Sequence, residues 1–272
     1  MIRSAVTVSL VPEARGGPFV FWDDLAAACA RAAALGFDAV EIFPRSPQEL
    51  NADEVRSLLG SHHLELAAVG TGAGWVVQRL RLTDPDAAVR ARARAFVAGV
   101  VDVAGSLGAP AIIGSMQGRH EGAISRAQAI DWLREALEEL GSRAQALGVP
   151  LLLEPLNRYE TNLVTSVDDG LEVLRSLLTR NVKLLVDLFH ANIEEVSIGD
   201  ALRRAGPALG HVHFADSNRR AIGMGHTDVA PVAAALREMG YDGFLSAEIL
   251  PLPDGEEAAR QTMASFRRWF RP

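Results

Sequence analysis

The stretch ALGVPLLLEPLNRYE, residues 146–160, shows the pattern that decides the fold. It joins the end of an alanine- and leucine-rich segment to Gly148, a short apolar run and the carboxylate of Glu154. A glycine in this place favours the left-handed end of a helix, and a short apolar run between turn signals favours a buried strand. The stretch therefore predicts a helix, a tight turn and a strand that ends on a carboxylate.

The same succession of helix, glycine and strand recurs along the chain, in AALGFDAV, AGSLGAPAII and REMGYDGFL. Short apolar runs predict strands at 2–10, 38–43, 64–71, 110–115, 150–154, 182–187, 210–215 and 244–248. Segments with helical periodicity predict helices at 22–35, 47–60, 85–107, 125–147, 167–179, 193–205, 228–239 and 255–270.

Strict alternation of these strands and helices over 272 residues predicts an α/β fold, the (β/α)8 TIM barrel. An open, doubly wound sheet is the structural alternative. It usually carries a GxGxxG turn after its first strand, and SLVPEARGGPF (9–19) has none. Because no linker or low-complexity segment interrupts the alternation, residues 1–272 are expected to form a single domain.

Composition and charge argue against several classes of partner. The net charge of −7 disfavours binding to nucleic acid. The sequence has neither a run of about 18 apolar residues nor a secretory signal, so no membrane association is expected. Cys29 is the only cysteine, which excludes a disulfide within the chain and favours a reducing, cytoplasmic setting.

Four consecutive strands, the fifth to the eighth, are expected to end on polar residues: Glu154, Asp187, His213 and Glu248. The carboxyl ends of barrel strands form the active-site face, so these side chains should meet at one rim. Clustered carboxylates repel one another, and a divalent cation would offset that repulsion. Taken singly, each carboxylate would more often be a helix cap or a solvated loop residue. Together they favour a metal site, with Mn²⁺, Mg²⁺ or Co²⁺ preferred over structural Zn²⁺.

Further polar residues lie close to these strand ends. His211 precedes His213 by two, so both should face one side of the strand, with His211 deeper as a hydrogen-bonded core residue. His190 follows Asp187 by three, at the rim and within reach of a substrate. Arg219 follows His213 by six, and the negative cluster favours a contact with substrate oxygens over a solvated position.

Several of these segments resemble those of a known family. EPLNRYE (154–160), DLFHANIEE (187–195), HVHFADSNRR (211–220) and SAEILPLP (246–253) resemble the xylose-isomerase-like sugar isomerase/epimerase superfamily. Within it, the sequence is most similar to the D-tagatose 3-epimerase and D-psicose 3-epimerase group, which includes 5-keto-L-gluconate epimerase. The segments AVEIFPRSP, AAVGTGAG, LTDPDAAVRARA, AIIGSMQGR and GMGHTD extend the resemblance over nearly the whole chain.

The resemblance implies a role for each matching residue. The implied metal ligands are Glu154, Asp187, His213 and Glu248, and the implied acid–base pair is Glu154 and Glu248. The implied substrate-binding residues are Glu160, His190 and Arg219. One divalent metal ion is implied, with Mn²⁺ expected and Mg²⁺ or Co²⁺ as alternatives. A small keto-sugar substrate and a homo-oligomer, a dimer or tetramer, are implied as well.

The sequence departs from its relatives in two places. Relatives often have proline where this chain has Ile222, and the loop GSMQGRH (114–120) differs from that of the ketohexose epimerases. Both places are expected to line the end of the substrate away from the metal. The exact sugar, and whether it carries a carboxylate or phosphate, therefore stays open.

The implied reaction is inversion of C3 in a ketose or keto-sugar acid. One of the two glutamates removes the C3 proton, and the other returns a proton to the opposite face through a cis-enediolate. Glu160 and His190 would hold the C1–C2 end, and Arg219 would bind O2.

Three alternative functions remain open. An aldose–ketose isomerase of the hydroxypyruvate or inosose type would use the same metal and return the proton to another carbon. A metal-dependent phosphoesterase of the apurinic endonuclease type would need more histidines and a basic groove. A non-catalytic sugar-binding barrel would need no acid–base pair.

Overall fold

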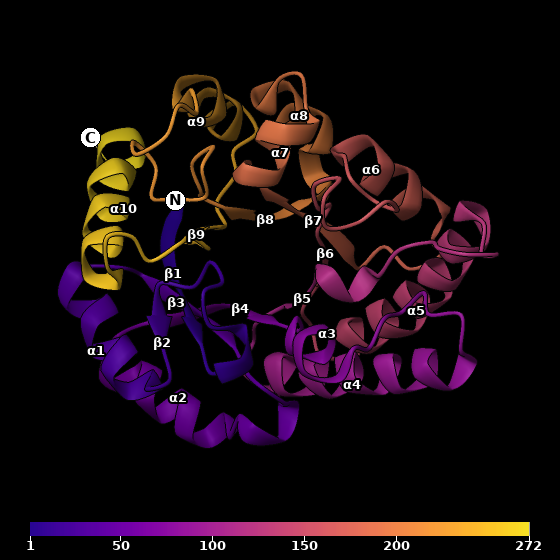
Figure 1. Ribbon diagram of the computed structural model, residues 1–272. Coiled ribbons are helices and arrows are strands. Elements are labelled where there is room, and N and C mark those ends of the chain that lie inside the picture. Colours follow the sequence, from indigo (N-terminus) through magenta and orange to yellow (C-terminus); the bar gives the residue numbers. More distant parts are fainter. Residues whose placement is uncertain (272) are drawn as a thin grey trace.

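Parallel strands close into a barrel in the computed structural model, which describes residues 1–271 (Figure 1). The barrel strands are β1 (Arg3–Ser9), β3 (Ala39–Phe43), β4 (Glu65–Gly70), β5 (Ala111–Ile113), β6 (Leu151–Leu153), β7 (Val182–Asp187), β8 (Leu209–His213) and β9 (Phe244–Ala247). Each strand pairs with the next, and β1 pairs with β9 to close the ring. The predicted (β/α)8 fold is confirmed. Residue 272, the last of the predicted domain, lies outside the described residues.

Helices form an outer ring around the strands (Figure 1). The main helices are α1 (Leu25–Leu35), α2 (Ala52–Ser61), α4 (Ala87–Ser106), α5 (Arg126–Ala146), α6 (Val167–Ser176), α8 (Ile198–Ala205), α9 (Val229–Glu238) and α10 (Gly255–Phe270). Gly148 ends the turn after α5 with φ of 74°, and Gly36, Gly108 and Gly240 also have positive φ after their helices. The predicted helix–glycine–strand turns are therefore confirmed.

Short elements modify the regular alternation. They comprise strand β2 (Phe21–Trp22), helices α3 (Ala73–Gln78) and α7 (Leu188–Glu194), and 3₁₀ turns at Pro12–Ala14, Pro47–Glu49, Ser115–Gln117 and Gly206–Ala208. The helix predicted at 193–205 is wrong in its start, because α7 begins directly after β7 and Ser197 caps a separate helix, α8. Among the described helices, none combines the length and apolar composition needed to cross a membrane.

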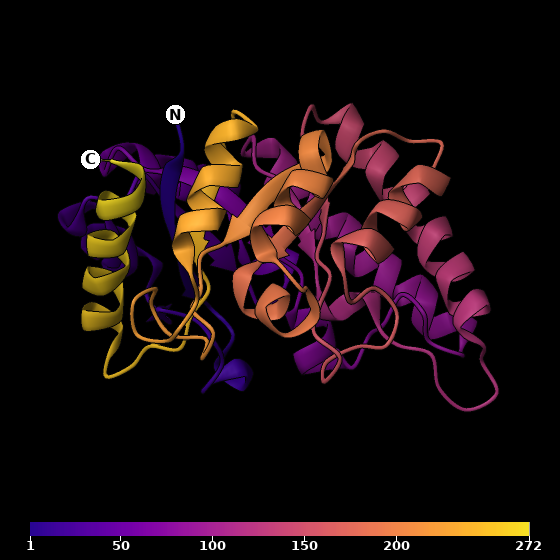
Figure 2. The ribbon, with the colours of Figure 1, turned by 90° about the horizontal axis from the view of Figure 1, so that it is seen from above.

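The barrel interior is divided into an apolar and a polar half. Strands β4 to β7 contribute an apolar cluster of Ala68, Ile112, Leu152 and Leu185, separate from the large core between strands and helices. The buried polar side chains on β1, β3, β8 and β9 include Thr7, Glu41, His211, His213 and Ser246. In Figure 2 the labelled N and C ends lie at one end of the barrel and the longest connections project from the other. Because β1 starts next to the N-terminus, the loop-bearing end holds the carboxyl ends of the strands.

A carboxylate joins three distant segments at the amino ends of the strands. Asp38 accepts hydrogen bonds from the backbone N and Oγ of Ser4 at 2.7 and 2.8 Å, and from Arg271 Nη2 at 2.6 Å. Burial opposes ionisation of Asp38, but the hydrogen bonds from Arg271 and Ser4 outweigh it and lower the pKa. This stabilisation is therefore present at neutral pH and is lost as the pH falls through the lowered pKa of the folded state.

Replacing Asp38 should destabilise the barrel more than replacing an exposed aspartate. Asp38→Asn is expected to lower the free energy of unfolding by about 2 kcal/mol, because charge-assisted hydrogen bonds are lost. Asp102→Asn is the matched control, since Asp102 pairs with Arg143 between exposed helix faces and should contribute less than about 1 kcal/mol. Urea denaturation at pH 7 measures both values, and equal losses would contradict the assignment.

Candidate active site

The alternation of side chains along strands brings four polar groups to one place. Leu152 of β6 faces the barrel interior, so Glu154, two residues later, faces the same side. In β7, Asp187 likewise comes two residues after Leu185, which faces the interior, so Asp187 faces the same side. With the ends of β8 and β9, the barrel therefore assembles a buried group of four side chains: Glu154, Asp187, His213 and Glu248.

These four side chains converge on a common point. One ligand atom from each lies within 4.8 Å of the others. His213 Nδ1 is 3.5 Å from Glu154 Oε1, 3.9 Å from Asp187 Oδ2 and 3.6 Å from Glu248 Oε2. Glu154 Oε1, Asp187 Oδ2 and His213 Nδ1 are buried and have no hydrogen-bond partner among the described residues. Because unpaired buried polar atoms are costly, three of them at one point fit a ligand that all three share.

The chemistry of the donor set fits a divalent metal ion. Three carboxylates and one imidazole provide hard oxygen ligands with a single nitrogen, as Mn²⁺ and related ions accept. Loss of solvation raises the pKa of Glu154 to about 8 and raises the pKa of Glu248 as well. A cation among these carboxyl groups would favour their ionised forms, so burial and metal binding are coupled at this site.

Glu41 of β3 supports this cluster from inside the barrel and is not among the residues predicted from the sequence. Its carboxylate contacts His211 Nε2 at 2.7 Å and His213 Nε2 at 3.0 Å. Burial would raise the pKa of Glu41, but the two imidazoles lower it, so the carboxylate is ionised. Holding Nε2 of His213 turns its Nδ1 toward the cluster. The available signal was a lone carboxylate in the middle of the apolar run AVEIF.

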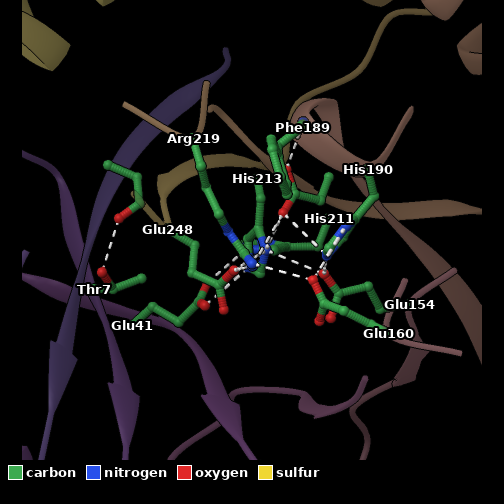
Figure 3. A network of polar contacts seen from close by, with 12 residues as sticks. Thr7, Glu41, Glu154, Glu160, Phe189, His190, His211, His213, Arg219 and Glu248 are labelled. Carbon is green, nitrogen blue, oxygen red and sulfur yellow. Dashed lines mark hydrogen bonds and ion pairs between the residues drawn. The ribbon is translucent and has the colours of Figure 1, made fainter. Parts of the chain in front are cut away.

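Glu160, in the turn after β6, and His190, on α7, lie at the edge of the cluster (Figure 3). His190 Nε2 lies 3.8 Å from Glu154 Oε1 and 3.6 Å from Asp187 Oδ2. His190, predicted at the rim, is 2% exposed and lies in the wall beside the cluster. Glu160 keeps 39% of its side chain exposed and faces Arg219 from the open side.

Arg219 reaches back over the cluster from the loop after β8. Its Nη2 is 2.6 Å from Glu248 Oε2, and its Nη1 is 3.4 Å from Glu160 Oε1. The residue has φ of 58°, a conformation that non-glycine residues rarely adopt. The loop keeps this shape through Asp216, whose carboxylate accepts four backbone N–H groups, from Ser217, Gly223, Gly225 and Thr227. The sequence indicated Arg219 but not the buried carboxylate that orders its loop.

A cavity of about 650 Å³ opens beside the cluster. Glu154, Glu160, Arg219 and Glu248 line one side, and Phe19, Phe43 and Trp75 form an apolar wall. Gly114 lies beneath, where a Cβ would collide with Glu154 Oε2. Four residues of the loop 114–120 line the cavity, namely Gly114, Ser115, Gly118 and Arg119, and Ile222 does not. Ile222 is buried in the loop after β8, where its carbonyl accepts hydrogen bonds from Gln261 and Ser265 of α10, so it does not line the cavity as predicted.

Comparison with known proteins identifies the family. The family model described as the xylose isomerase-like TIM barrel matches residues 29–269. The chain belongs to this family. The resemblance of its motifs is therefore confirmed.

Several relatives are named as sugar epimerases. The chain is 32% identical to the D-psicose 3-epimerase of Agrobacterium fabrum, over 80% of this chain and 76% of that protein. It is 31% identical to the L-ribulose 3-epimerase of a Methylomonas species, over 86% and 83%. A solved structure of D-allulose 3-epimerase from Methylomonas sp., in complex with D-allulose, covers 99% of this chain and 97% of its own, with 25% identity and a TM-score of 0.82. These relatives confirm the prediction of an isomerase-class enzyme.

The contact between Glu41 and His213 should tune metal affinity. Glu41→Gln keeps the shape but removes the negative charge, so the affinity for Mn²⁺ is expected to fall by roughly 10- to 100-fold. Isothermal titration calorimetry with Mn²⁺ measures the change. Glu65→Gln is the matched control, because Glu65 lies at the exposed start of β4 and should leave the affinity unaltered. Equal affinity in all three proteins would contradict this role for Glu41.

Proposed function

We propose that this chain is a metal-dependent epimerase that inverts C3 of a small ketose or keto-sugar acid. The observation that carries the proposal is a pair of buried carboxyl groups, Glu154 and Glu248, beside a cavity of sugar-binding size. They follow β6 and β9, and both lie within 3.6 Å of His213 Nδ1. The family, and relatives named as ketose 3-epimerases, support the same reaction.

The proposed metal ligands are Glu154, Asp187, His213 and Glu248, with Mn²⁺ as the expected ion and Mg²⁺ or Co²⁺ as alternatives. When bound, the ion supplies Lewis-acid stabilisation of the negative charge that develops on the ketone and adjacent oxygens. Asp187 and His213 have no proposed part in proton transfer. Their proposed role is to bind the metal ion, with Glu41 hydrogen-bonded to His213.

The proposed proton transfers belong to Glu154 and Glu248. Inversion requires a base on one face of C3 and an acid on the other, which one carboxyl group cannot supply. Burial raises the pKa of both groups, which favours the protonated form that the acid must present. In one direction Glu154 removes the proton and Glu248 returns one, through a cis-enediolate. In the reverse direction the two exchange roles.

Three further residues are proposed to bind the sugar. Glu160 and His190 hold the C1–C2 end, and Arg219 donates to O2. The contact between Arg219 and Glu248 supports this placement, because a group bound by the guanidinium lies beside an acid–base carboxylate. The proposed enzyme is a cytoplasmic homo-oligomer, a dimer or tetramer, which sedimentation of the purified protein tests.

A panel of substrates in D₂O tests the reaction. The metal-loaded protein is incubated with ketohexoses and keto-sugar acids, and NMR follows deuterium at C3 and the configuration of the product. Deuterium at C3 with inversion supports the epimerase. Proton return to another carbon, with an aldose as product, supports the aldose–ketose isomerase instead.

Replacing one of the two acid–base groups should separate proton removal from inversion. Glu248→Gln is expected to lower the rate of epimerisation by roughly 10²- to 10⁴-fold, because an amide neither accepts nor returns the proton. Glu154 should still exchange the C3 hydrogen of the epimer that faces it, without inversion. NMR in D₂O measures both rates.

Glu238→Gln is the matched control, since Glu238 pairs with Arg203 at the exposed end of α9. This variant should epimerise at the unaltered rate. Full epimerase activity in Glu248→Gln would refute the two-base mechanism.

A further inference from the structure

The side-chain amide of Asn157 has an orientation that its neighbours determine. Asn157 is 2% exposed and lies in the turn after β6. The backbone N–H of Tyr159 donates to its Oδ1 at 3.0 Å. Because a backbone N–H can only donate, the atom that faces Tyr159 must be the amide oxygen. The amide nitrogen therefore lies on the opposite branch, toward Glu160 and His190.

The amide nitrogen has two hydrogens and two neighbours that can accept them. It donates to Glu160 Oε1 at 3.1 Å and lies 2.7 Å from His190 Nδ1. An amide nitrogen cannot accept a hydrogen bond, so His190 Nδ1 must be the acceptor in the second contact. A proton on Nδ1 would set two donors against each other at 2.7 Å. The contact thus excludes both the Nδ1–H tautomer and the imidazolium.

From this geometry we propose that Asn157 is a positioning residue that locks His190 in its Nε2–H tautomer and makes it a permanent hydrogen-bond donor to the substrate. The proposal deepens the epimerase function and rests on it for the identity of the acceptor, a keto-sugar oxygen. His190 Nε2 is buried and has no hydrogen-bond partner among the described residues. The N–H therefore faces the space beside Glu154 and Asp187, at 3.8 and 3.6 Å from their oxygens, which is too far for hydrogen bonds.

The fixed tautomer of His190 limits the reactions in which this side chain can transfer a proton. Interconversion of an aldose and a ketose requires a proton to leave one hydroxyl oxygen and arrive at its neighbour. A side chain that carries this proton must accept as well as donate. His190 cannot accept at Nε2, which already holds a hydrogen, or at Nδ1, which Asn157 occupies. His190 can hold a substrate oxygen but cannot relay its proton, so proton transfer in this site is left to the carboxyl groups.

The nitrogen spectrum of His190 tests the lock without a substrate. The protein is labelled with ¹⁵N-histidine and loaded with Mg²⁺, and long-range ¹H–¹⁵N correlation distinguishes protonated from unprotonated ring nitrogens. His190→Gln assigns the signals by their loss. The expected result is an unprotonated Nδ1 and a protonated Nε2. A protonated Nδ1 in the wild-type protein would overturn the proposal, and this outcome depends on no variant at Asn157.

A change at Asn157 should reverse the tautomer. Asn157→Asp keeps the size and the acceptor for Tyr159 but presents an oxygen to His190, so Nδ1 is expected to become protonated. Asn162→Asp is the matched control. Asn162 lies in the same loop, and its side chain hydrogen-bonds the backbone of His120, so the spectrum of His190 should be unaltered. An Nε2–H tautomer that persists in Asn157→Asp would show that something else sets it.

Kinetics show whether Asn157 acts through His190. Asn157→Asp is expected to lower kcat/KM roughly 10- to 100-fold, because one hydrogen bond to the substrate is lost. The new carboxylate also faces Glu160, so all variants are compared in the Glu160→Gln background, where the Gln amide can donate to it. With His190→Ala added, Asn157→Asp should cost less than about 2-fold, because coupled residues are not additive. An undiminished cost would indicate a merely structural role and overturn the proposal.

The two kinds of failure are distinguishable. If the chain has another activity, the spectra still report the tautomer of His190, and only the identity of the acceptor is lost. If it epimerises C3 while Nδ1 is protonated, the proposed function stands and the lock is wrong.

Discussion

Crowding of three buried carboxylates around one imidazole is the constraint on which the rest of this structure depends. The group forms because the ends of β6 to β9 point the same way in a closed barrel, and burial then opposes its ionisation. Two neighbouring side chains are arranged around that charge. Glu41 turns His213 toward the cluster, and Arg219 adopts a left-handed conformation to reach it. The fold thus brings together carboxylates whose mutual repulsion a divalent cation would offset.

The barrel and its four strand-end residues could be predicted because they follow from local patterns. A period of two along an apolar run fixes which face a side chain takes, and alternation with helices fixes which end of the strand meets the cavity. The position of Glu154 at the end of a buried strand can be predicted from the three leucines before it alone. The break between α7 and α8 was missed because no glycine or proline marks it, although Glu195 and Ser197 are both extended between the two helices.

Glu41 and Asn157 could not be found in this way, because their roles depend on closure of the barrel. Glu41 is separated from His211 and His213 by 170 and 172 residues and meets them only inside the ring. Asn157 looks like an ordinary turn residue, and its contact with His190 arises when α7 begins directly after β7. The burial of His190 has the same origin. Residues that hold other site residues are thus the ones that local sequence does not indicate.

Two kinds of polar group therefore have different proposed roles at the barrel mouth. Glu154 and Glu248 are buried carboxyl groups with raised pKa values, which suits groups that must gain and lose protons. His190 is held by an amide that removes its capacity to accept, which suits a group that must keep one hydrogen in one place. An imidazole free to titrate beside these carboxyl groups would offer the substrate a competing proton path. The neutral amide of Asn157 prevents this competing path. Unlike a charged partner, it adds nothing to the repulsion among the carboxylates.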